Sequence, residues 1–417
     1  MGARRIPAVQ AAVEIMKDEG ADTVFGCPGT ALLPLYAAME RTGGIAHLSA
    51  GHAEGAAHMA DGWARTTGKA GVVAVAAGPG AVRLLSGLYA ARQDAVPLVC
   101  VTGREASAPP APAIPLRHAG YRPPDLVRLA GAVTKRAERI EDPARIPGAF
   151  REAFRIAREG RPGPVLIDVP ADLAGVEIMC GPGPVAPSAP GAGPALVDGV
   201  RSPAPGAALP LSAPADPAGT GAHWALAELA ALFGGGSSAD TYADTYVVSG
   251  LPEASASRPG ASRPGASRPG AARRHRVPRR NGPPGWEVPT AIGVRKALDS
   301  RGERAAEVVV VVDGRGFPLT AGELAAAAQY EVPFVVVLLG GAEDADPFTD
   351  PVKLAEAYGC AGRDVLDPAD LRSAVEWARK EAVSTRRPVL VEVRAERAAD
   401  AYDGLPADPV HTHAYGT

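Results

Sequence analysis

Short, continuous apolar runs bounded by glycine and proline constrain the fold of this chain more than any other feature. The segment VVVVVDGRGF at residues 308–317 is a run of valines that passes directly into a glycine-rich turn. FVVVLLGG at 334–341 and PVLIDVP at 164–170 have the same character. Runs of this length, rich in β-branched residues, are typical of strands that are buried on both faces of a parallel sheet. Such strands need helices on both sides to cover them.

Helical patterns alternate with these strand-like runs in two separate parts of the chain. Strands that alternate with helices predict right-handed βαβ units. We therefore expect an α/β fold with two doubly wound parallel-sheet domains, the first at residues 1–175 and the second at 222–417. The expected strands lie at 72–77, 97–102, 164–170, 308–312, 334–339 and 389–393, and the expected helices at 54–67, 82–92, 223–233, 319–329, 352–358 and 368–380.

The region between the two expected domains has a different composition. Residues 176–221 are rich in Pro, Gly, Ala and Ser and poor in large apolar residues, which predicts a linker. Further on, the sequence ASRPG occurs three times over 256–270 and is followed by RRHRVPRR at 273–280. This basic stretch is either a disordered loop kept soluble by charge or a contact for phosphate or RNA. No aromatic residue interleaves with its arginines, so we expect disorder at 255–280 and no nucleic-acid partner.

Whole-chain composition bounds the remaining function classes. The 417 residues carry a formal net charge of -3, which gives no reason to expect an obligatory polyanionic partner. The longest apolar runs are strand-sized and fall below the roughly 18 residues of a membrane helix, so we expect no membrane partner. The N-terminus lacks the apolar core of a signal peptide. The four cysteines form no CxxC pair, which favours a reducing, cytoplasmic setting over a zinc site or a disulfide framework.

Several long strings resemble one enzyme family. GCPGTALLPLYAAMERTGGIAHLSAGHAEGAAHMADGWAR (26–65) is similar to the pyrimidine-binding domain of thiamine-diphosphate-dependent enzymes of the acetolactate synthase group, and most similar to glyoxylate carboligase within it. NGPPGWEVPTAIGV (281–294) and GELAAAAQYEVP (322–333) resemble the diphosphate-binding domain of the same family. The family also has a central domain, for which residues 176–221 are too few. The resemblance implies thiamine diphosphate and magnesium as cofactors, and a small 2-oxo acid such as glyoxylate or pyruvate as substrate.

The resemblance also assigns positions for the cofactor, and several of them carry unexpected residues. The family glutamate that binds the aminopyrimidine falls on Ala53, a position that is also apolar in glyoxylate carboligase, with His52 before it. The magnesium-binding Asp position falls on Gly314 and the Asn position on Gly341, while Asp313 stands one residue early as a candidate metal ligand. The other residues implied around the cofactor are Gly26, Pro28, Gly29, Gly78, Gly80, Pro284 (the wedge position) and Gly285.

Neighbouring residues offer further candidates. Glu54 follows Ala53, but one step along a helix turns a side chain by about 100°, so we do not expect it to replace the family glutamate. His52 has either a structural role at the start of a helix or a catalytic one. Arg83, Arg104 and Arg122 stand where the family has small polar residues or glutamine. They are either surface arginines or a clamp for a carboxylate or phosphate substrate.

Three functions are compatible with this pattern. The first is a carboligase or decarboxylase of 2-oxo acids. The second is a non-catalytic paralogue that acts as a dimerising or regulatory subunit, as a homodimer or in a heteromer with an active paralogue, because active sites of this family form between two chains. The third is a scaffold that binds RNA or an acidic partner through residues 257–280. Residues that build sheets and turns are retained, whereas residues that touch the cofactor are replaced by glycine or alanine. The sequence therefore predicts a degenerate active site on a retained fold.

Overall fold

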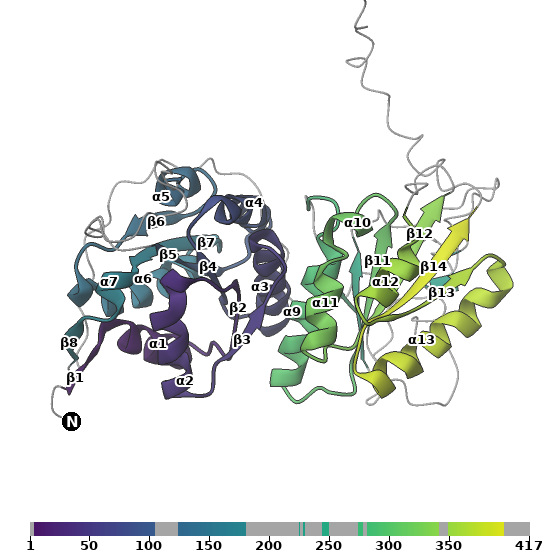
Figure 1. Cartoon of the computed structure of the whole chain (residues 1–417), viewed down its shortest axis with the longest axis horizontal. Helices are drawn as coiled ribbons and strands as arrows, with labels where there is room; N and C mark the ends of the chain where they lie inside the picture. The colour runs from purple at the N-terminus through teal and green to yellow at the C-terminus, as the bar shows by residue number, and fades with distance from the viewer. Residues whose placement is uncertain are drawn as a thin grey trace, which may run out of the picture.

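Two six-stranded parallel sheets, each covered by helices, form the body of the molecule (Figure 1). The computed structural model describes residues 4–104, 124–180, 225, 228–229, 244–249, 274–277, 282–341 and 349–395. The predicted linker beyond residue 180 and the ASRPG repeat lie outside this part of the chain. All strand pairs within both six-stranded sheets are parallel, so the α/β class with two doubly wound parallel sheets is confirmed.

The first sheet has the strand order β3-β2-β4-β5-β7-β6. Successive side chains of a strand point to opposite faces of the sheet, so each inner strand contributes to a core on both sides. In β4, Val73 and Val75 join the core under α3 and α4, whereas Val72 and Ala74 join the core under α1 and α6. A two-stranded antiparallel ribbon of β1 and β8 lies at the end of the molecule that carries the N-terminus. The elements of this domain are β1 (Arg4–Pro7), α1 (Ala8–Asp18), β2 (Thr23–Cys27), η1 (Thr30–Leu32), α2 (Leu33–Thr42), β3 (Ala46–Ser49), α3 (Ala53–Thr67), β4 (Gly71–Ala76), η2 (Pro79–Arg83), α4 (Leu84–Gln93), β5 (Leu98–Arg104), α5 (Leu126–Ala130), β6 (Arg136–Arg139), η3 (Pro143–Arg145), α6 (Ile146–Arg158), β7 (Pro164–Pro170), α7 (Ala171–Ala174) and β8 (Glu177–Cys180).

The second sheet has the order β10-β9-β11-β12-β14-β13. The valine run forms β11, in which Val308, Val310 and Val312 face the core shared with α9. Val309 and Val311 face the opposite core under α13. The elements are β9 (Thr245–Ser249), β10 (Arg274–Val277), α9 (Glu287–Ser300), β11 (Glu307–Asp313), α10 (Phe317–Thr320), α11 (Glu323–Gln329), β12 (Val335–Gly341), α12 (Pro351–Ala357), β13 (Ala361–Val365), η4 (Pro368–Asp370), α13 (Leu371–Thr385) and β14 (Val389–Ala395).

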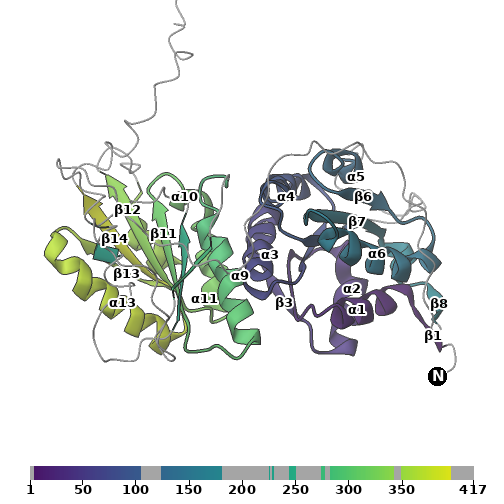
Figure 2. The ribbon, with the colours of Figure 1, turned by 180° about the vertical axis from the view of Figure 1, so that it is seen from behind.

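Helices α3 and α9 join the two domains. Both views of the ribbon show them side by side between the two sheets (Figures 1 and 2). Glycines allow the two backbones to approach closely. A Cβ atom on Gly293 of α9 would lie 1.8 Å from the carbonyl oxygen of Met59, and a Cβ on Gly62 of α3 would lie 2.2 Å from that of Thr290. One apolar core therefore runs continuously from the first sheet to the second.

Some local expectations differ from the structure. Residues 274–277, within the stretch that we expected to be disordered, form β10 and pair with β9. Residues 177–180, within the expected linker, form β8 and pair with β1. The expected helix at 319–329 is two helices, α10 and α11, separated at residues 321–322. Pairing with neighbouring strands overrides local composition in the first two cases.

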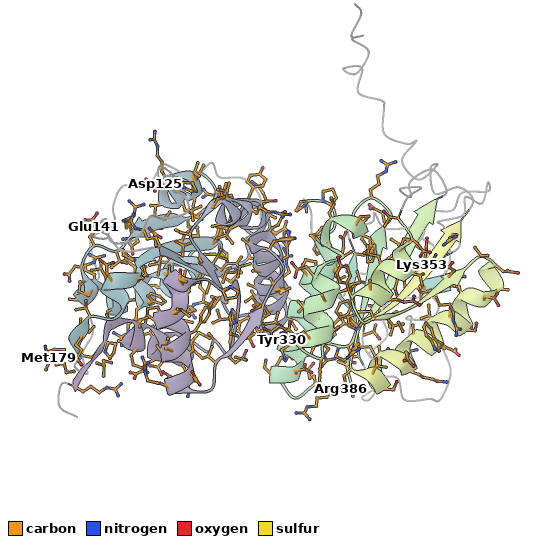
Figure 3. All side chains as sticks on the ribbon, viewed as in Figure 1. Asp125, Glu141, Met179, Tyr330, Lys353 and Arg386 are labelled. Atoms are coloured by element: carbon orange, nitrogen blue, oxygen red, sulfur yellow. The ribbon has the colours of Figure 1, made fainter. Side chains whose placement is uncertain are left out.

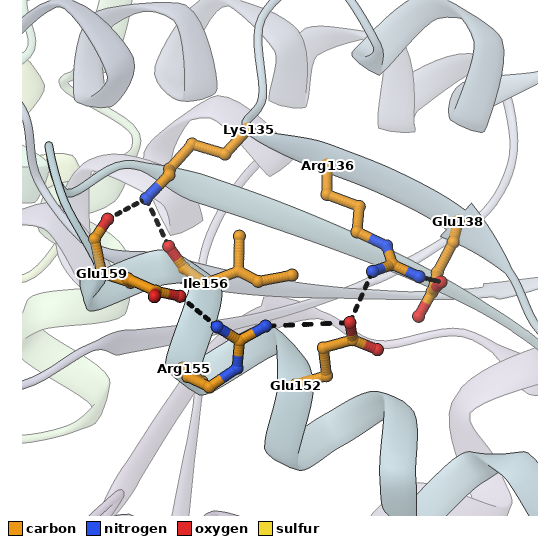
Figure 4. A network of polar contacts seen from close by, with 7 residues as sticks. All are labelled: Lys135, Arg136, Glu138, Glu152, Arg155, Ile156 and Glu159. Carbon is orange, nitrogen blue, oxygen red and sulfur yellow. Dashed lines mark hydrogen bonds and ion pairs between the residues drawn. The ribbon is translucent and has the colours of Figure 1, made fainter. Parts of the chain in front are cut away.

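Charged residues fasten α6 to the edge strand β6 (Figure 4). Arg136 forms ion pairs with Glu138 at 2.5 Å and with Glu152 of α6 at 2.7 Å. Lys135 donates to the backbone oxygens of Ile156 and Glu159, which closes the last turn of α6. These contacts lie on the outer side of the first domain, so they stabilise the fold without shaping the candidate site. No helix within the described ranges combines the length and apolar character needed to span a bilayer.

Candidate functional site

The carboxyl ends of β2, β3 and β4 meet along one edge of the first sheet. In open parallel sheets, ligands bind outside this edge. Here β2 ends at Cys27, β3 ends at Ser49 and leads through Gly51 into α3, and β4 leads through Gly78 into η2. The second domain reaches this edge through both ends of α11. At one end lies Tyr330, which Figure 3 places between the two domains. Its hydroxyl accepts a hydrogen bond of 3.1 Å from the amide of Ser49.

His52 caps the N-terminus of α3. Its backbone is extended, and its Nδ1 atom accepts a hydrogen bond of 2.9 Å from the amide of Gly55. Because Nδ1 is an acceptor, the neutral imidazole carries its proton on Nε2. Burial lowers the pKa of His52, and the nearby charge of Arg83 lowers it further. His52 is therefore held in its neutral form with the Nε2–H directed away from the helix.

Glu323, at the first position of α11, places a buried carboxyl against this imidazole. Its side chain is only 1% exposed. Oε2 accepts a hydrogen bond of 2.9 Å from the amide of Gly51, and Oε1 lies 3.7 Å from Nε2 of His52. Burial raises the pKa of Glu323 to about 7, against the opposing effect of backbone hydrogen bonds from Gly51 and His52 and of the Arg83 charge. This carboxyl therefore exchanges a proton near neutral pH.

Two glycines make room for the Glu323 carboxyl. A Cβ atom on Gly55 would lie 2.1 Å from Oε1, and a Cβ on Gly51 would lie 3.3 Å from the same atom. We did not single out Glu323 from the sequence. The available signal was its helical spacing, since Glu323 shares the buried face of α11 with Ala326 and Ala327. An acid on an apolar helix face needs a buried partner.

Glu54 points to a different neighbour. It accepts a hydrogen bond of 2.6 Å from Ser86 Oγ of α4, and its Oε1 lies 3.8 Å from Nε2 of His58. The interaction with His58, together with the hydrogen bond from Ser86, lowers the pKa of Glu54 to about 2. Glu54 is therefore ionised at neutral pH and bound to α4, whereas Ala53, at the family glutamate position, is buried and has no polar atom on its side chain.

The three arginines are not brought together as one set. Arg83 is exposed at the end of η2, where its charge acts on Cys27, His52 and Glu323. Arg104 is half-buried at the end of β5. Arg122 lies outside the described residues. Of the two arginines that the structure describes, Arg83 alone therefore acts electrostatically on the Glu323 carboxyl.

The two predicted metal positions lie at the ends of neighbouring parallel strands of the second sheet. Gly341 is the last residue of β12, and Gly314 follows β11 and donates its amide to the carbonyl of Leu339 at 3.1 Å. Asp313 Oδ1 accepts a hydrogen bond of 2.6 Å from the amide of Gly316, so this carboxylate caps its own turn. Within the described ranges, no group of three or more His, Cys, Asp or Glu residues could hold a metal ion.

The wedge loop packs onto this same turn. Pro284 is exposed, and Gly285 after it has a positive φ of 84°. A Cβ atom on Gly285 would lie 2.4 Å from the carbonyl oxygen of Gly316, so only glycine fits at this position. The Thr320 hydroxyl donates to the carbonyl of Gly285 at 2.6 Å. The wedge loop therefore contacts the backbone of this turn and the hydroxyl of Thr320 in α10.

The glycines of the first domain divide into two kinds. Gly26 and Gly29 are packing residues, since a Cβ atom on them would lie 2.0 Å from the carbonyl oxygen of Ala74 and 2.3 Å from Cβ of Ala76. Gly78 and Gly80 adjoin open space, because no atom lies within 4 Å of the corresponding Cβ positions. Pro28 is exposed. The turn at 78–80 thus keeps the space that a ligand at this edge would need.

Comparison with known proteins relates the first domain to one family. Residues 7–110 match the profile described as thiamine pyrophosphate enzyme, N-terminal TPP binding domain. The glyoxylate carboligase of Escherichia coli O157:H7 is 39% identical over 179 residues, which make up 43% of this chain and 29% of the carboligase. The acetolactate synthase large subunit of Lactococcus lactis subsp. lactis is 38% identical over 169 residues, which make up 40% of this chain and 28% of that subunit. The matched segment is thus less than a third of the length of these relatives.

Comparison of structures extends the likeness to the second domain. A solved structure titled "X-ray structure of a putative thiamin diphosphate-dependent enzyme isolated from Mycobacterium smegmatis" superimposes with a TM-score of 0.61 at 16% sequence identity. The superposition covers 93% of this chain and 99% of that one, so the two share their fold. Residues 7–110 are therefore similar to the thiamine pyrophosphate enzyme N-terminal domain, and the chain as a whole shares its fold with that solved structure.

Proposed function

We propose that this chain is a thiamine pyrophosphate-fold protein with a degenerate cofactor site, which works as a non-catalytic, dimerising or regulatory subunit. The observation that carries the proposal is the pair of glycines at the metal positions. Gly314 and Gly341 offer no side-chain oxygen at the ends of β11 and β12. Magnesium requires oxygen ligands in near-octahedral geometry and is usually anchored by a carboxylate. The ion that would fix a diphosphate therefore has no side-chain ligand at these two positions.

The nearest carboxylate does not replace the missing ligands. Asp313 Oδ1 is engaged by the amide of Gly316, and release of that bond would leave the amide in the turn without its partner. Glu343 and Asp344, which the sequence suggests as substitutes, lie outside the described residues. Among the described residues, the donor set does not fit magnesium-bound thiamine diphosphate, and we derive no reaction step through that cofactor.

The fold is retained beside the glycines at the metal positions: the α3–α9 contact, with its close glycine approaches, joins the two domains within this one chain. One relative is itself described as a large subunit, which suggests assembly with other chains. We propose a homodimer or a heteromer with an active paralogue. The four cysteines are all unpaired, which supports a reducing, cytoplasmic setting.

A second candidate function is a carboligase or decarboxylase of small 2-oxo acids, as in glyoxylate carboligase. The observation that favours it is the buried Glu323 carboxyl beside His52 and within the field of Arg83. A carboxyl with a pKa near 7 is suited to general acid–base chemistry. It lies next to the loop that leads to Ala53, so it could supply the acid that position 53 lacks. Arg83 would attract the substrate carboxylate.

A thermal-shift measurement of the full chain with thiamine diphosphate and Mg²⁺ separates the two functions. A ligand that binds the folded state at about 100 times its Kd stabilises that state by about 2.7 kcal/mol. The non-catalytic proposal predicts no rise in Tm at millimolar cofactor. A rise of several degrees that requires the metal, together with release of carbon dioxide from glyoxylate or pyruvate, would instead establish the carboligase.

A further inference from the structure

One buried acid connects the two domains. We propose that the Glu323 carboxyl is a pH-operated latch, which holds α11 of the second domain against the loop before α3 when it is protonated and loosens this contact when it is ionised. The latch is independent of any cofactor and of the proposed subunit role. Its parts are the Glu323 side chain, the amides of Gly51 and His52, and the space provided by Gly55.

The geometry makes Glu323 the sensitive element of the interface. Polar contacts between the domains include the Gly51–Glu323 bond, the Ser49–Tyr330 bond, and a bond of 2.9 Å from Arg301 Nη1 to the carbonyl oxygen of Thr66. The Arg301 contact is exposed to solvent. Glu323 is 1% exposed, and its Oε1 has no hydrogen-bond partner among the described residues. An ionised carboxylate is therefore poorly compensated at this place.

The neighbouring groups cannot take up the proton in its place. His52 would have to accept it on Nδ1, and this atom is the acceptor that caps α3. Burial raises the pKa of Cys27 to about 11, so its thiol stays neutral. Glu54 faces α4, and Tyr330 is bonded to Ser49.

Two further charged or titratable groups belong to elements that pack near Glu323. Arg83 is an exposed cation in η2 whose charge favours the ionised form of Glu323. Glu287, in the first turn of α9, is 7% exposed and has interactions of its own. Glu323 is therefore a group of this interface that takes up a proton near neutral pH.

The direction of the pH effect follows from linkage. The pKa of Glu323 is about 7 with the domains in contact, against 4.5 when the carboxyl is solvated. A raised acid pKa means that the closed contact binds the proton more tightly, so closure is most favourable below pH 4.5. Closure weakens as pH rises from 4.5 to 7 and is constant above 7. Across this window the equilibrium constant for closing falls by on the order of a hundredfold.

The test compares the full-length wild type with Glu323→Gln between pH 5 and 8. Glutamine keeps the shape and the acceptor for Gly51 but cannot ionise. We expect the Tm of the variant relative to the wild type to increase from pH 5 to 7 and to level off above 7. Amide hydrogen exchange is measured in a peptide covering residues 49–55. The ratio of its exchange rate in the wild type to that in the variant at the same pH should increase by up to a hundredfold as pH rises. Glu331→Gln, at an exposed glutamate just beyond α11, should reproduce the wild-type profile.

A second variant, Arg83→Met, tests the latch independently if Glu323→Gln does not fold. Arg83→Met removes the exposed cation that favours the ionised carboxyl, so the decline in stability should extend to higher pH. Arg128→Met, at an exposed arginine of α5, should leave the profile unchanged. Parallel pH profiles for wild type and Glu323→Gln, or identical midpoints for Arg83→Met and Arg128→Met, would overturn the latch.

Discussion

Single residues at the loops decide what each domain of this molecule can bind. At the first sheet, the cap of α3 is a histidine whose Nδ1 is committed to the amide of Gly55. At the second sheet, Asp313 is committed to the amide of Gly316. In both places a side chain that could act on a ligand is used to hold its own backbone turn. Glu323, by contrast, has a buried carboxyl oxygen, Oε1, without a hydrogen-bond partner among the described residues.

The cap of α3 gives a prediction at this scale. His52→Ala removes the acceptor for the amide of Gly55 and should destabilise the chain by about 1 kcal/mol, as loss of an N-cap does. His52→Asn restores a capping acceptor and should recover most of the loss. Urea unfolding followed by circular dichroism measures both variants. Equal destabilisation by alanine and asparagine would show that the imidazole does more than cap the helix.

The candidate site was only partly predictable from the sequence. Ala53, Gly314 and Gly341 could be placed because the strings around them resemble a known family. Their structural surroundings could not, since the partner of the α3 loop comes from a residue about 270 positions later in the chain. No local pattern encodes the contact between Gly51 and Glu323. It arises because α3 packs on α9, which brings α11 to the loop before α3.

At the scale of elements, the α3–α9 pair dominates the architecture. Close approach of two helices requires small residues where the backbones meet. Gly62 and Gly293 serve this need, each facing a carbonyl oxygen of the other helix. The pair places the carboxyl edge of the first sheet next to the second domain. The packing of α3 on α9 therefore forms both the interface and the candidate site.

Gly293→Ala tests that packing. The added methyl would lie 1.8 Å from the carbonyl oxygen of Met59, a backbone atom that cannot move aside alone. We expect destabilisation of about 1–3 kcal/mol from overpacking, although alanine has the higher helix propensity by up to about 1 kcal/mol. Gly80→Ala is the matched control, because open space surrounds its Cβ position. The account of the interface fails if chemical denaturation finds Gly293→Ala as stable as wild type.

The sequence predicts central strands better than edge strands. Central strands such as β4, β5 and β11 are continuous apolar runs because both faces are buried, and the predictions for them are confirmed. Edge strands lack that signal. β6 has the sequence RAER and β13 the sequence AGRDV, and neither is fully buried. Pairing with an inner strand, which is a tertiary effect, defines them.

At the scale of the whole molecule, the proposed function assumes that the fold is retained without the family's chemistry. The apolar core runs without interruption through both domains, which accounts for the likeness to a solved thiamin diphosphate-dependent enzyme across 93% of the chain. The two metal positions lie at the ends of strands, Gly314 directly after β11 and Gly341 as the last residue of β12. Under the proposed function, such a pair of sheets would persist without metal ligands.

Calorimetric titration of thiamine diphosphate with Mg²⁺ into the full chain, beside the Gly314→Asp/Gly341→Asn variant, tests this account most directly. The restored carboxylate and amide would supply the two side-chain oxygens that magnesium lacks here. We predict no metal-dependent binding heat for the wild type at millimolar cofactor, and saturable, metal-dependent binding for the double variant. Metal-dependent binding by the wild type with the same affinity as the double variant would contradict the account.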